Sequence, residues 1–330
     1  MAIKTIVCTG DSHTWDQGIP KLEDTFDPPV TAGDLRLVSF RFGCYVNLLR
    51  DMINEKTGSS AKELTAEDIR RIYGKKQILD CAAVDDTPLQ LHTHAQLIRI
   101  QFHYLDAPSK AAVYIDGVLV REIDLQRADI RNGYRTESFF CEPEGEHRLT
   151  VISRQGTVAL YRIEQYFGTT AVLNCGVGSS PTFRYLSEYW NDYVVSLKPS
   201  LCIMEPHTIN DWLAGDPPNV YGQHLKEMID RLRAINCGVV MMTVAPIAGP
   251  QDFPFNKTPY SDYVEESRRI AKICGVPQSD ANAVMNSRIQ GLSEDEAFKL
   301  LFCDNWHVNA YGHGIYANEA YRTLIDMKYI

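Results

Sequence analysis

The sequence predicts an α/β protein with a doubly wound parallel sheet and an inserted antiparallel β-sandwich domain. The β-branched apolar run Ile3–Cys8 is typical of a parallel strand buried on both faces. Strand-like and helix-like segments alternate again after residue 183, as in a parallel α/β sheet. Between them, residues 79–167 change to short alternating strands. We therefore expect a discontinuous α/β domain, 1–78 and 168–330, around an inserted domain at 79–167.

Each predicted element has a local signal. Apolar residues at helical spacing predict a helix over Leu35–Met52, and Thr65 has the features of a helix N-cap. Within the insert, Asp116-Gly117 between two apolar runs is a strong hairpin signal. The predicted β-rich segments of the insert include 97–104, 112–120 with this hairpin, and 147–153. After the insert we expect strand 170–173, helix 183–197, strand 201–205, helix 221–236, strand 238–244, helix 260–274, a strand near 276, helix 293–302 and a last helix to Met327.

Composition narrows the class of protein. The 330 residues are 45% hydrophobic and 23% charged, enough for one large core or two smaller ones. A net charge of −9 without a Lys/Arg cluster argues against a nucleic-acid partner. No apolar stretch approaches the roughly 18–20 residues of a membrane span, so no membrane partner is expected.

The start of the chain and its cysteines suggest a compartment. Met1–Lys4 leads into the first strand without the apolar region of a signal peptide, which predicts a cytoplasmic protein. Secretion would require a leader that this sequence does not include. The nine cysteines are scattered and form no C-x-x-C pair, so reduced, buried thiols are the simplest account.

Two short motifs near the ends of the chain contain the candidate catalytic residues. Gly10-Asp11-Ser12-His13 follows the first predicted strand, and the carboxyl edge of an open α/β sheet is where ligands bind. A serine hydroxyl is a weak nucleophile and needs a general base that is itself oriented by a carboxylate. Asp304 and His307 have the i, i+3 spacing that places such a pair side by side. The sequence therefore predicts Ser12 as nucleophile, His307 as base and Asp304 as its orienting group.

With these motifs the chain resembles the SGNH hydrolases, also called GDSL-type esterases, which carry a G-D-S block and a D-x-x-H block. Two further blocks of that family correspond to Asn174–Ser179 and to Thr208-Ile209-Asn210-Asp211. The resemblance implies a flavodoxin-like sheet and an oxyanion hole. Its donors would be the Ser12 amide, the amide of either Gly178 or Ser179, and the Asn210 side chain. The inserted strands resemble the jelly-roll modules that accompany many carbohydrate esterases.

The resemblance implies a serine esterase that removes short acyl groups, with acetyl on a carbohydrate as the expected substrate. The alternatives are a lysophospholipase- or thioesterase-type acyl hydrolase, and a carbohydrate-binding protein without turnover. Asp11, His207 and Trp306 adjoin the motifs and are candidate substrate contacts; for His207 the alternative is a histidine held by its neighbours. No cofactor and no metal are expected. The expected partner is a small-molecule or oligosaccharide ester, and a homo-oligomer is left open.

Overall fold

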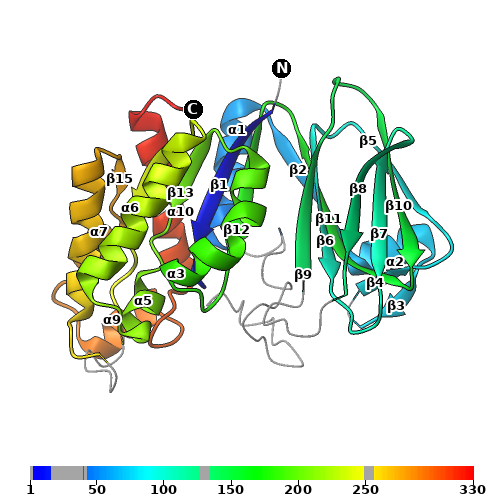
Figure 1. The fold of residues 1–330 in the computed structure, drawn as a ribbon. Helices are drawn as coiled ribbons and strands as arrows, with labels where there is room; N and C mark the ends of the chain where they lie inside the picture. Colours follow the sequence, from blue (N-terminus) through cyan, green and yellow to red (C-terminus); the bar gives the residue numbers. More distant parts are fainter. Residues whose placement is uncertain (1–2, 16–39, 41–42, 80, 127–133, 249–255) are drawn as a thin grey trace. The chain divides into compact units, whose positions relative to one another are not determined.

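The structure is a computed structural model that describes residues 3–15, 40, 43–79, 81–126, 134–248 and 256–330. It divides into two compact units. One consists mainly of Thr57–Ala171 and contains antiparallel sheets, and the other contains the first strand, the first helix and Val172–Ile330 (Figure 1). Each unit is described by itself.

The α/β unit is built on a five-stranded sheet in the order β12-β1-β13-β14-β15. The pairs β1–β13, β13–β14 and β14–β15 are parallel. Numbered by their order along the chain, the five strands lie as 2-1-3-4-5, which is the flavodoxin-like doubly wound order. The predicted parallel α/β sheet is therefore confirmed. The strands are β1 (Lys4–Gly10), β12 (Thr170–Gly176), β13 (Leu201–Met204), β14 (Gly238–Met242) and β15 (Gln278–Ser279).

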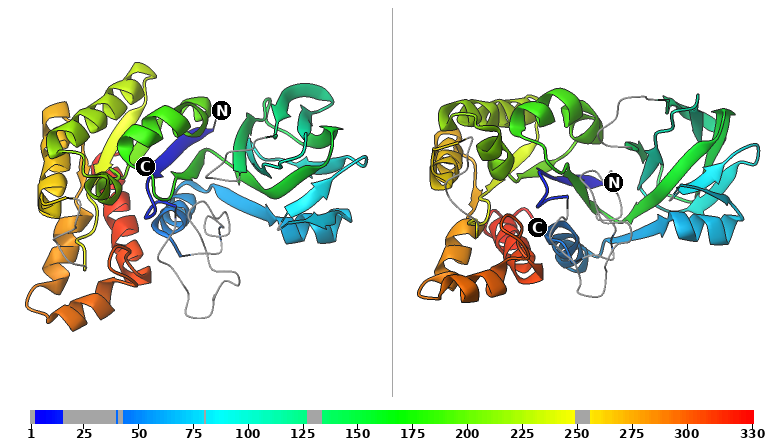
Figure 2. Two further views of the ribbon diagram at one scale, coloured as in Figure 1. Left: turned by 60° about the horizontal axis from the view of Figure 1, so that its bottom comes forward. Right: turned by 90° about the horizontal axis from the view of Figure 1, so that it is seen from below.

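Helices lie on both faces of this sheet. The blue α1 and red α10 lie on one face, and the green α3 and α6 on the other (Figure 2). Side chains of β1, β13 and β14, among them Ile6 and Ile203, form a buried apolar cluster with side chains of α1, α8 and α10 such as Leu49 and Tyr316. The helices are α1 (Tyr45–Thr57), α3 (Thr182–Arg184), α4 (Trp190–Tyr193), α5 (Thr208–Ala214), α6 (Pro218–Ala234), α7 (Tyr260–Cys274), α8 (Ala281–Ile289), α9 (Glu294–Leu301) and α10 (Ala310–Asp326). None of the helices in the described part of the chain has the length and apolarity needed to cross a membrane.

The helices of the structure differ from the predicted ones in three ways. The helix expected at 183–197 is broken into α3, a π-helical turn (Tyr185–Tyr189), α4 and a 3₁₀ turn (Val195–Leu197). The short helices α5 and α8 were not predicted. Most of the expected helix start, 35–44, lies outside the described residues, and α1 continues five residues past its expected end at Met52.

The second unit contains two antiparallel sheets. One has the order β5-β10-β7-β8, and the other has the order β3-β4-β11-β6-β9 with β2 also paired to β11. Their inward-facing side chains, such as Val113 and Leu149 from the first sheet and Ile98 and Ile163 from the second, share one apolar cluster. The elements are β2 (Ser60–Thr65), α2 (Ala66–Tyr73), β3 (Lys76–Ile78), β4 (Cys81–Val84), β5 (Leu89–Thr93), β6 (Leu97–His103), β7 (Lys110–Ile115), β8 (Val118–Asp124), β9 (Tyr134–Phe140), β10 (His147–Gln155) and β11 (Val158–Phe167).

Two local predictions in this unit are confirmed. Asp116 and Gly117 connect β7 and β8 with positive φ angles of 53° and 81°, as a tight type I′ hairpin requires. Thr65 is the N-cap of α2, and it forms a capping box with Asp68. The unit nevertheless begins before the expected boundary at residue 79, because β2 pairs with β11 along its whole length.

Candidate active site

The turn that carries Ser12 begins where β1 ends. A Cβ at Gly10 would overlap Glu205 Oε2 and Thr14 Oγ1, so only glycine allows the two segments to approach this closely. The turn is closed by a hydrogen bond from the Trp15 N–H to the Asp11 carbonyl, at 2.9 Å. Ser12 thus lies at the carboxyl end of β1, where a parallel α/β sheet places its ligands.

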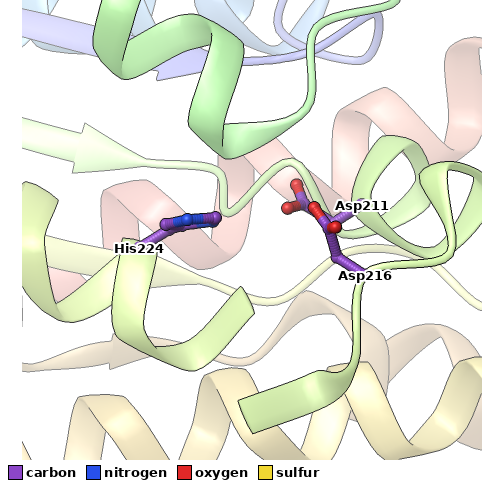
Figure 3. Close-up of side chains that lie close together, drawn as sticks. All are labelled: Asp211, Asp216 and His224. Atoms are coloured by element: carbon purple, nitrogen blue, oxygen red, sulfur yellow. The ribbon is translucent and has the colours of Figure 1, made fainter. Parts of the chain in front are cut away.

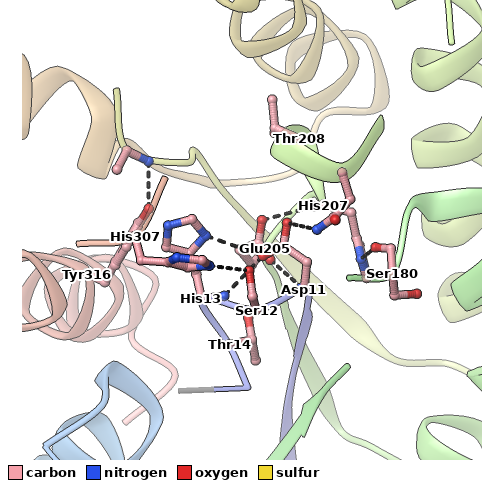
Figure 4. A network of polar contacts seen from close by, with 12 residues as sticks. Asp11, Ser12, His13, Thr14, Ser180, Glu205, His207, Thr208, His307 and Tyr316 are labelled. Atoms are coloured by element: carbon pink, nitrogen blue, oxygen red, sulfur yellow. Dashed lines mark hydrogen bonds and ion pairs between the residues drawn. The ribbon is translucent and has the colours of Figure 1, made fainter. Parts of the chain in front are cut away.

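Ser12, His307 and Asp304 lie in one hydrogen-bonded row, although Ser12 precedes His307 by 295 positions in the sequence. His307 Nε2 is 3.0 Å from Ser12 Oγ, and His307 Nδ1 is 2.7 Å from Asp304 Oδ2. The other carboxylate oxygen of Asp304 accepts the N–H groups of Trp306, at 2.8 Å, and of His307, at 2.7 Å. Because Nδ1 faces the Asp304 carboxylate, Nε2 is the ring nitrogen that can accept a proton from the serine. Figure 4 shows the contact between His307 and Ser12.

The charge on Asp304 is maintained by its partners. Partial burial alone would oppose ionisation of this carboxyl group, but the hydrogen bond and charge of His307, with the two backbone N–H groups, lower its pKa to about 2. Asp304 is therefore ionised at neutral pH. A carboxylate in this position can stabilise an imidazolium that forms when His307 takes up a proton.

The candidate oxyanion donors lie near the same turn. The Asn210 amide, in the first turn of α5, donates one hydrogen to Asp11 Oδ2 at 2.8 Å and has a second hydrogen left. Among the described residues, no hydrogen bond engages the backbone N–H of Ser12, Gly178 or Ser179. Gly178 packs so closely on Trp15 that a Cβ would lie 2.7 Å from its ring. Ser179 is exposed and has a φ of 55°.

Of the three residues expected to contact substrate, Asp11 and His207 are better explained as buried residues that hold other parts of the site in place. Asp11 has no exposed surface, and its carboxylate accepts the N–H of His13, at 3.1 Å, besides the Asn210 amide. His207 is also fully buried, and its Nδ1 lies 2.7 Å from the Ser180 carbonyl. Burial lowers the pKa of His207, so the ring is neutral and Nδ1 donates this bond. Trp306 remains half-buried, with its ring 5.7 Å from that of Trp212.

A cluster of Asp211, Asp216 and His224 lies beside the second and third blocks (Figure 3). The Asp211 carboxyl group accepts the Thr182 N–H at 2.8 Å and the Thr182 hydroxyl at 2.6 Å, and His224 Nδ1 is 2.9 Å from that hydroxyl. Burial raises the pKa of Asp211 to about 8. These bonds tie the segment after Ser179 to α5, which is a supporting role that the sequence motifs did not indicate.

The φ angle of Ser179 leads to a stability prediction. A positive φ costs a non-glycine residue about 1–2 kcal/mol, and the corresponding position of the resembled family carries glycine. Ser179→Gly should therefore raise the free energy of unfolding by up to about 1 kcal/mol in a denaturant titration. Ser187→Gly, in the neighbouring helical segment, is the matched control and should lower it by about 0.5–1 kcal/mol. Equal destabilisation by both changes would contradict the conformational explanation.

Comparison with known proteins identifies a family domain in the chain. Residues 153–315 match the model of the GDSL-like lipase/acylhydrolase family. This part of the chain is a domain of that family. The match includes the block of Asn210 and the pair Asp304 and His307, while Ser12 precedes it. As a GDSL-like protein, the chain is a carboxylic ester hydrolase at the level of its family.

Several solved structures are similar to this chain, and one of them has a TM-score above 0.5. A peptidoglycan O-acetylesterase is 13% identical over 98% of this chain and 91% of its own, with a TM-score of 0.54. An α/β hydrolase from a metagenome of Lake Arreo, Spain, is 14% identical over 98% and 96%, with a TM-score of 0.48. An acetylxylan esterase from Geobacillus stearothermophilus is 21% identical over 47% and 72%, with a TM-score of 0.40. No curated protein sequence matches the chain.

Proposed function

We propose that this GDSL-like protein is a serine esterase that removes acetyl groups from a carbohydrate through an acyl-enzyme. The observation that carries the proposal is the row of hydrogen bonds from Asp304 through His307 to Ser12. A nucleophile, a base and an orienting carboxylate in contact are the minimum set for acyl transfer by serine. The backbone N–H groups of Ser12, Gly178 and Ser179, which form no hydrogen bond among the described residues, support the same chemistry because they could stabilise an oxyanion.

In the proposed reaction Ser12 Oγ attacks the ester carbonyl carbon, and its proton passes to His307 Nε2. The carbonyl oxygen becomes an oxyanion and receives hydrogen bonds from the Ser12 amide, the amide of Gly178 or Ser179, and the Asn210 side chain. The C–O bond to the alcohol then breaks, and His307 returns the proton to the leaving oxygen. Water attacks the acyl-enzyme in the same way, releasing the acid and restoring the Ser12 hydroxyl.

The choice of an acetylated carbohydrate rests on two features. The peptidoglycan O-acetylesterase resembles this chain over almost its whole length, including the antiparallel sheets. We also infer that these sheets form a jelly roll. Support comes from the nested pairing β4–β11, β5–β10, β6–β9 and β7–β8, which is what one long hairpin of eight strands makes when it is rolled up.

A panel of substrates tests the proposal. The purified protein should hydrolyse p-nitrophenyl acetate much faster than esters of longer acyl chains, and it should release acetate from acetylated xylo-oligosaccharides or O-acetylated peptidoglycan fragments. A preference for long acyl chains would instead favour a lysophospholipase or thioesterase. Binding of an acetylated oligosaccharide without hydrolysis of any ester would indicate a carbohydrate-binding protein that lacks turnover.

The pH dependence of kcat/KM is a further prediction. The assigned base is a histidine, and only a neutral imidazole can accept the serine proton, so the rate should fall on the acid side of the profile. Asp304 keeps its charge because its pKa is lowered to about 2, so it should add no second loss near pH 4, where ordinary carboxyl groups titrate. A profile measured from about pH 3 to 9 checks both statements. An acid limb centred near pH 4 would contradict the assigned base.

A further inference from the structure

Glu205 is a buried carboxyl group that the proposed reaction does not use. It follows the last residue of β13, and its backbone N–H continues the strand pairing by donating to the Thr9 carbonyl at 2.9 Å. Its side chain has no exposed surface and fills the space that Gly10 leaves by lacking a Cβ. Glu205 therefore lies directly behind the turn that carries Ser12 (Figure 4).

The two carboxyl oxygens of Glu205 hold two different turns. Oε2 accepts the N–H of Asp11 at 2.6 Å, and Oε1 accepts the N–H of His207 at 2.9 Å. Asp11 immediately precedes Ser12, and His207 is the residue from which α5 begins, three positions before Asn210. One side chain thus links the backbone of the nucleophile turn to the backbone of the turn that carries the side-chain oxyanion donor.

The pKa shifts of Glu205 and Asp11 are compatible with a role of Glu205 in linking the two turns. Burial, followed by the nearby charge of Asp11, raises the pKa of Glu205 well above its usual range. For Asp11, burial has the same tendency, but hydrogen bonding and charge from His13 outweigh it and hold the pKa below its usual range. The opposite directions of the two shifts favour the negative charge on Asp11 over a charge on Glu205. In its neutral form Glu205 can hold both amides without adding a second negative charge near a developing oxyanion, where that charge would oppose catalysis.

We propose that Glu205 is a positioning residue of the oxyanion hole, which sets the Ser12 amide and the Asn210 side chain at a common distance from the reacting carbonyl oxygen. This role rests on the esterase activity proposed above. Oxyanion donors act only when they are placed in advance within hydrogen-bond distance of the oxygen, so a loss of alignment lowers the rate without removing any donor. Glu205 itself touches neither substrate nor the reacting atoms.

Glu205→Gln is the primary test, because glutamine has the same shape but only one acceptor oxygen for two backbone N–H groups. We expect kcat on p-nitrophenyl acetate to fall by roughly 10- to 100-fold, a part of the 10²–10³-fold that one oxyanion donor is worth. KM should change little, because alignment matters most in the transition state. An unchanged kcat, or a loss confined to KM, would overturn the positioning role.

A double-mutant cycle with Asn210→Ala tests whether Glu205→Gln lowers kcat by displacing the Asn210 side chain. Asn210→Ala alone should cost on the order of 10²–10³-fold in kcat. If Glu205 acts through the Asn210 turn, the rate lost in Glu205→Gln/Asn210→Ala should be smaller than the product of the two single losses. A loss equal to that product would show that Glu205 acts independently of Asn210 and would overturn the proposed link.

Controls separate this inference from simple destabilisation and from failure of the esterase proposal. Glu164→Gln removes another buried carboxylate, which accepts the Tyr166 hydroxyl at 2.8 Å in the antiparallel unit, and it should lower stability without changing kcat. If wild type and Ser12→Ala were equally inactive, the esterase proposal itself would fail. If Glu205→Gln does not fold, the proposal is tested by NMR on the wild-type protein, through the chemical shifts of the backbone amide protons of Asp11 and His207. Downfield chemical shifts would support the hydrogen bonds of these amides to Glu205. Ordinary chemical shifts would contradict these hydrogen bonds and with them the positioning role.

Discussion

Ser12→Ala should lower kcat on p-nitrophenyl acetate by about 10⁴-fold or more. The hydroxyl is the atom proposed to form the acyl-enzyme, and no other group in the row of Asp304 and His307 can replace it as nucleophile. The substitution removes one oxygen from a small side chain, and the hydrogen bond lost is the one to His307 Nε2. The variant should therefore fold normally while losing its turnover.

The fold of this variant is checked by its circular dichroism spectrum and its thermal midpoint. Ser267→Ala is a matched control, because Ser267 in α7 is also buried and, among the described residues, its hydroxyl bonds only to the Val264 carbonyl. It should keep the wild-type rate. Retention of even a tenth of the wild-type kcat by Ser12→Ala, after removal of contaminating esterase, would rule out the serine mechanism.

Asp304→Asn should be nearly as damaging, with a loss in kcat on the order of 10⁴-fold at neutral pH. Oδ1 of Asp304 is held by the backbone N–H groups of Trp306 and His307, so an asparagine should keep its oxygen there. Its NH₂ group would then occupy the position of Oδ2 and donate to Nδ1 of His307. This favours the tautomer with hydrogen on Nε2, which cannot accept a proton from Ser12.

The loss should appear in kcat with little change in KM, since Asp304 acts on the base and not on the bound ester. Asn305→Ala changes the exposed neighbouring side chain and should remain close to wild type. A loss below about tenfold for Asp304→Asn would mean that the Asp304–His307 contact is not needed for proton transfer.

The parallel core of the fold was predictable because its strands are uniformly apolar. Every residue of β1 after Lys4 is buried, and such runs contrast clearly with the helices between them. The polar strand β2 gave no such signal, since Leu64 is its only buried residue and its place depends on pairing with β11. The break of helix 183–197 by a π-helical turn likewise depends on tertiary packing, which overrides local propensity.

The site was predictable where its chemistry is local in sequence. Asp304 and His307 are one turn apart, and Ser12 follows a strand and a glycine. Their spacing in the sequence was therefore enough to predict a nucleophile, a base and an orienting carboxylate. The buried residues that hold these side chains in place, such as Glu205, were not predictable in this way. A glutamate at the end of a strand is ordinarily solvated, and the close contact of Glu205 with Gly10 becomes visible only in the structure. The complete burial of Asp11 and His207 favours a supporting role for both residues over the contact with substrate that the sequence suggested.

Covalent labelling of the nucleophile tests the central claim most directly. The protein is treated with a p-nitrophenyl alkylphosphonate, which mimics the tetrahedral intermediate and is trapped by an activated serine, and the modified residue is located by peptide mass spectrometry. We predict loss of activity in step with addition of one phosphonyl group, located on Ser12, and no labelling of Ser12→Ala. Labelling of a different residue in step with inactivation, or full activity with Ser12 modified, would contradict the proposed mechanism.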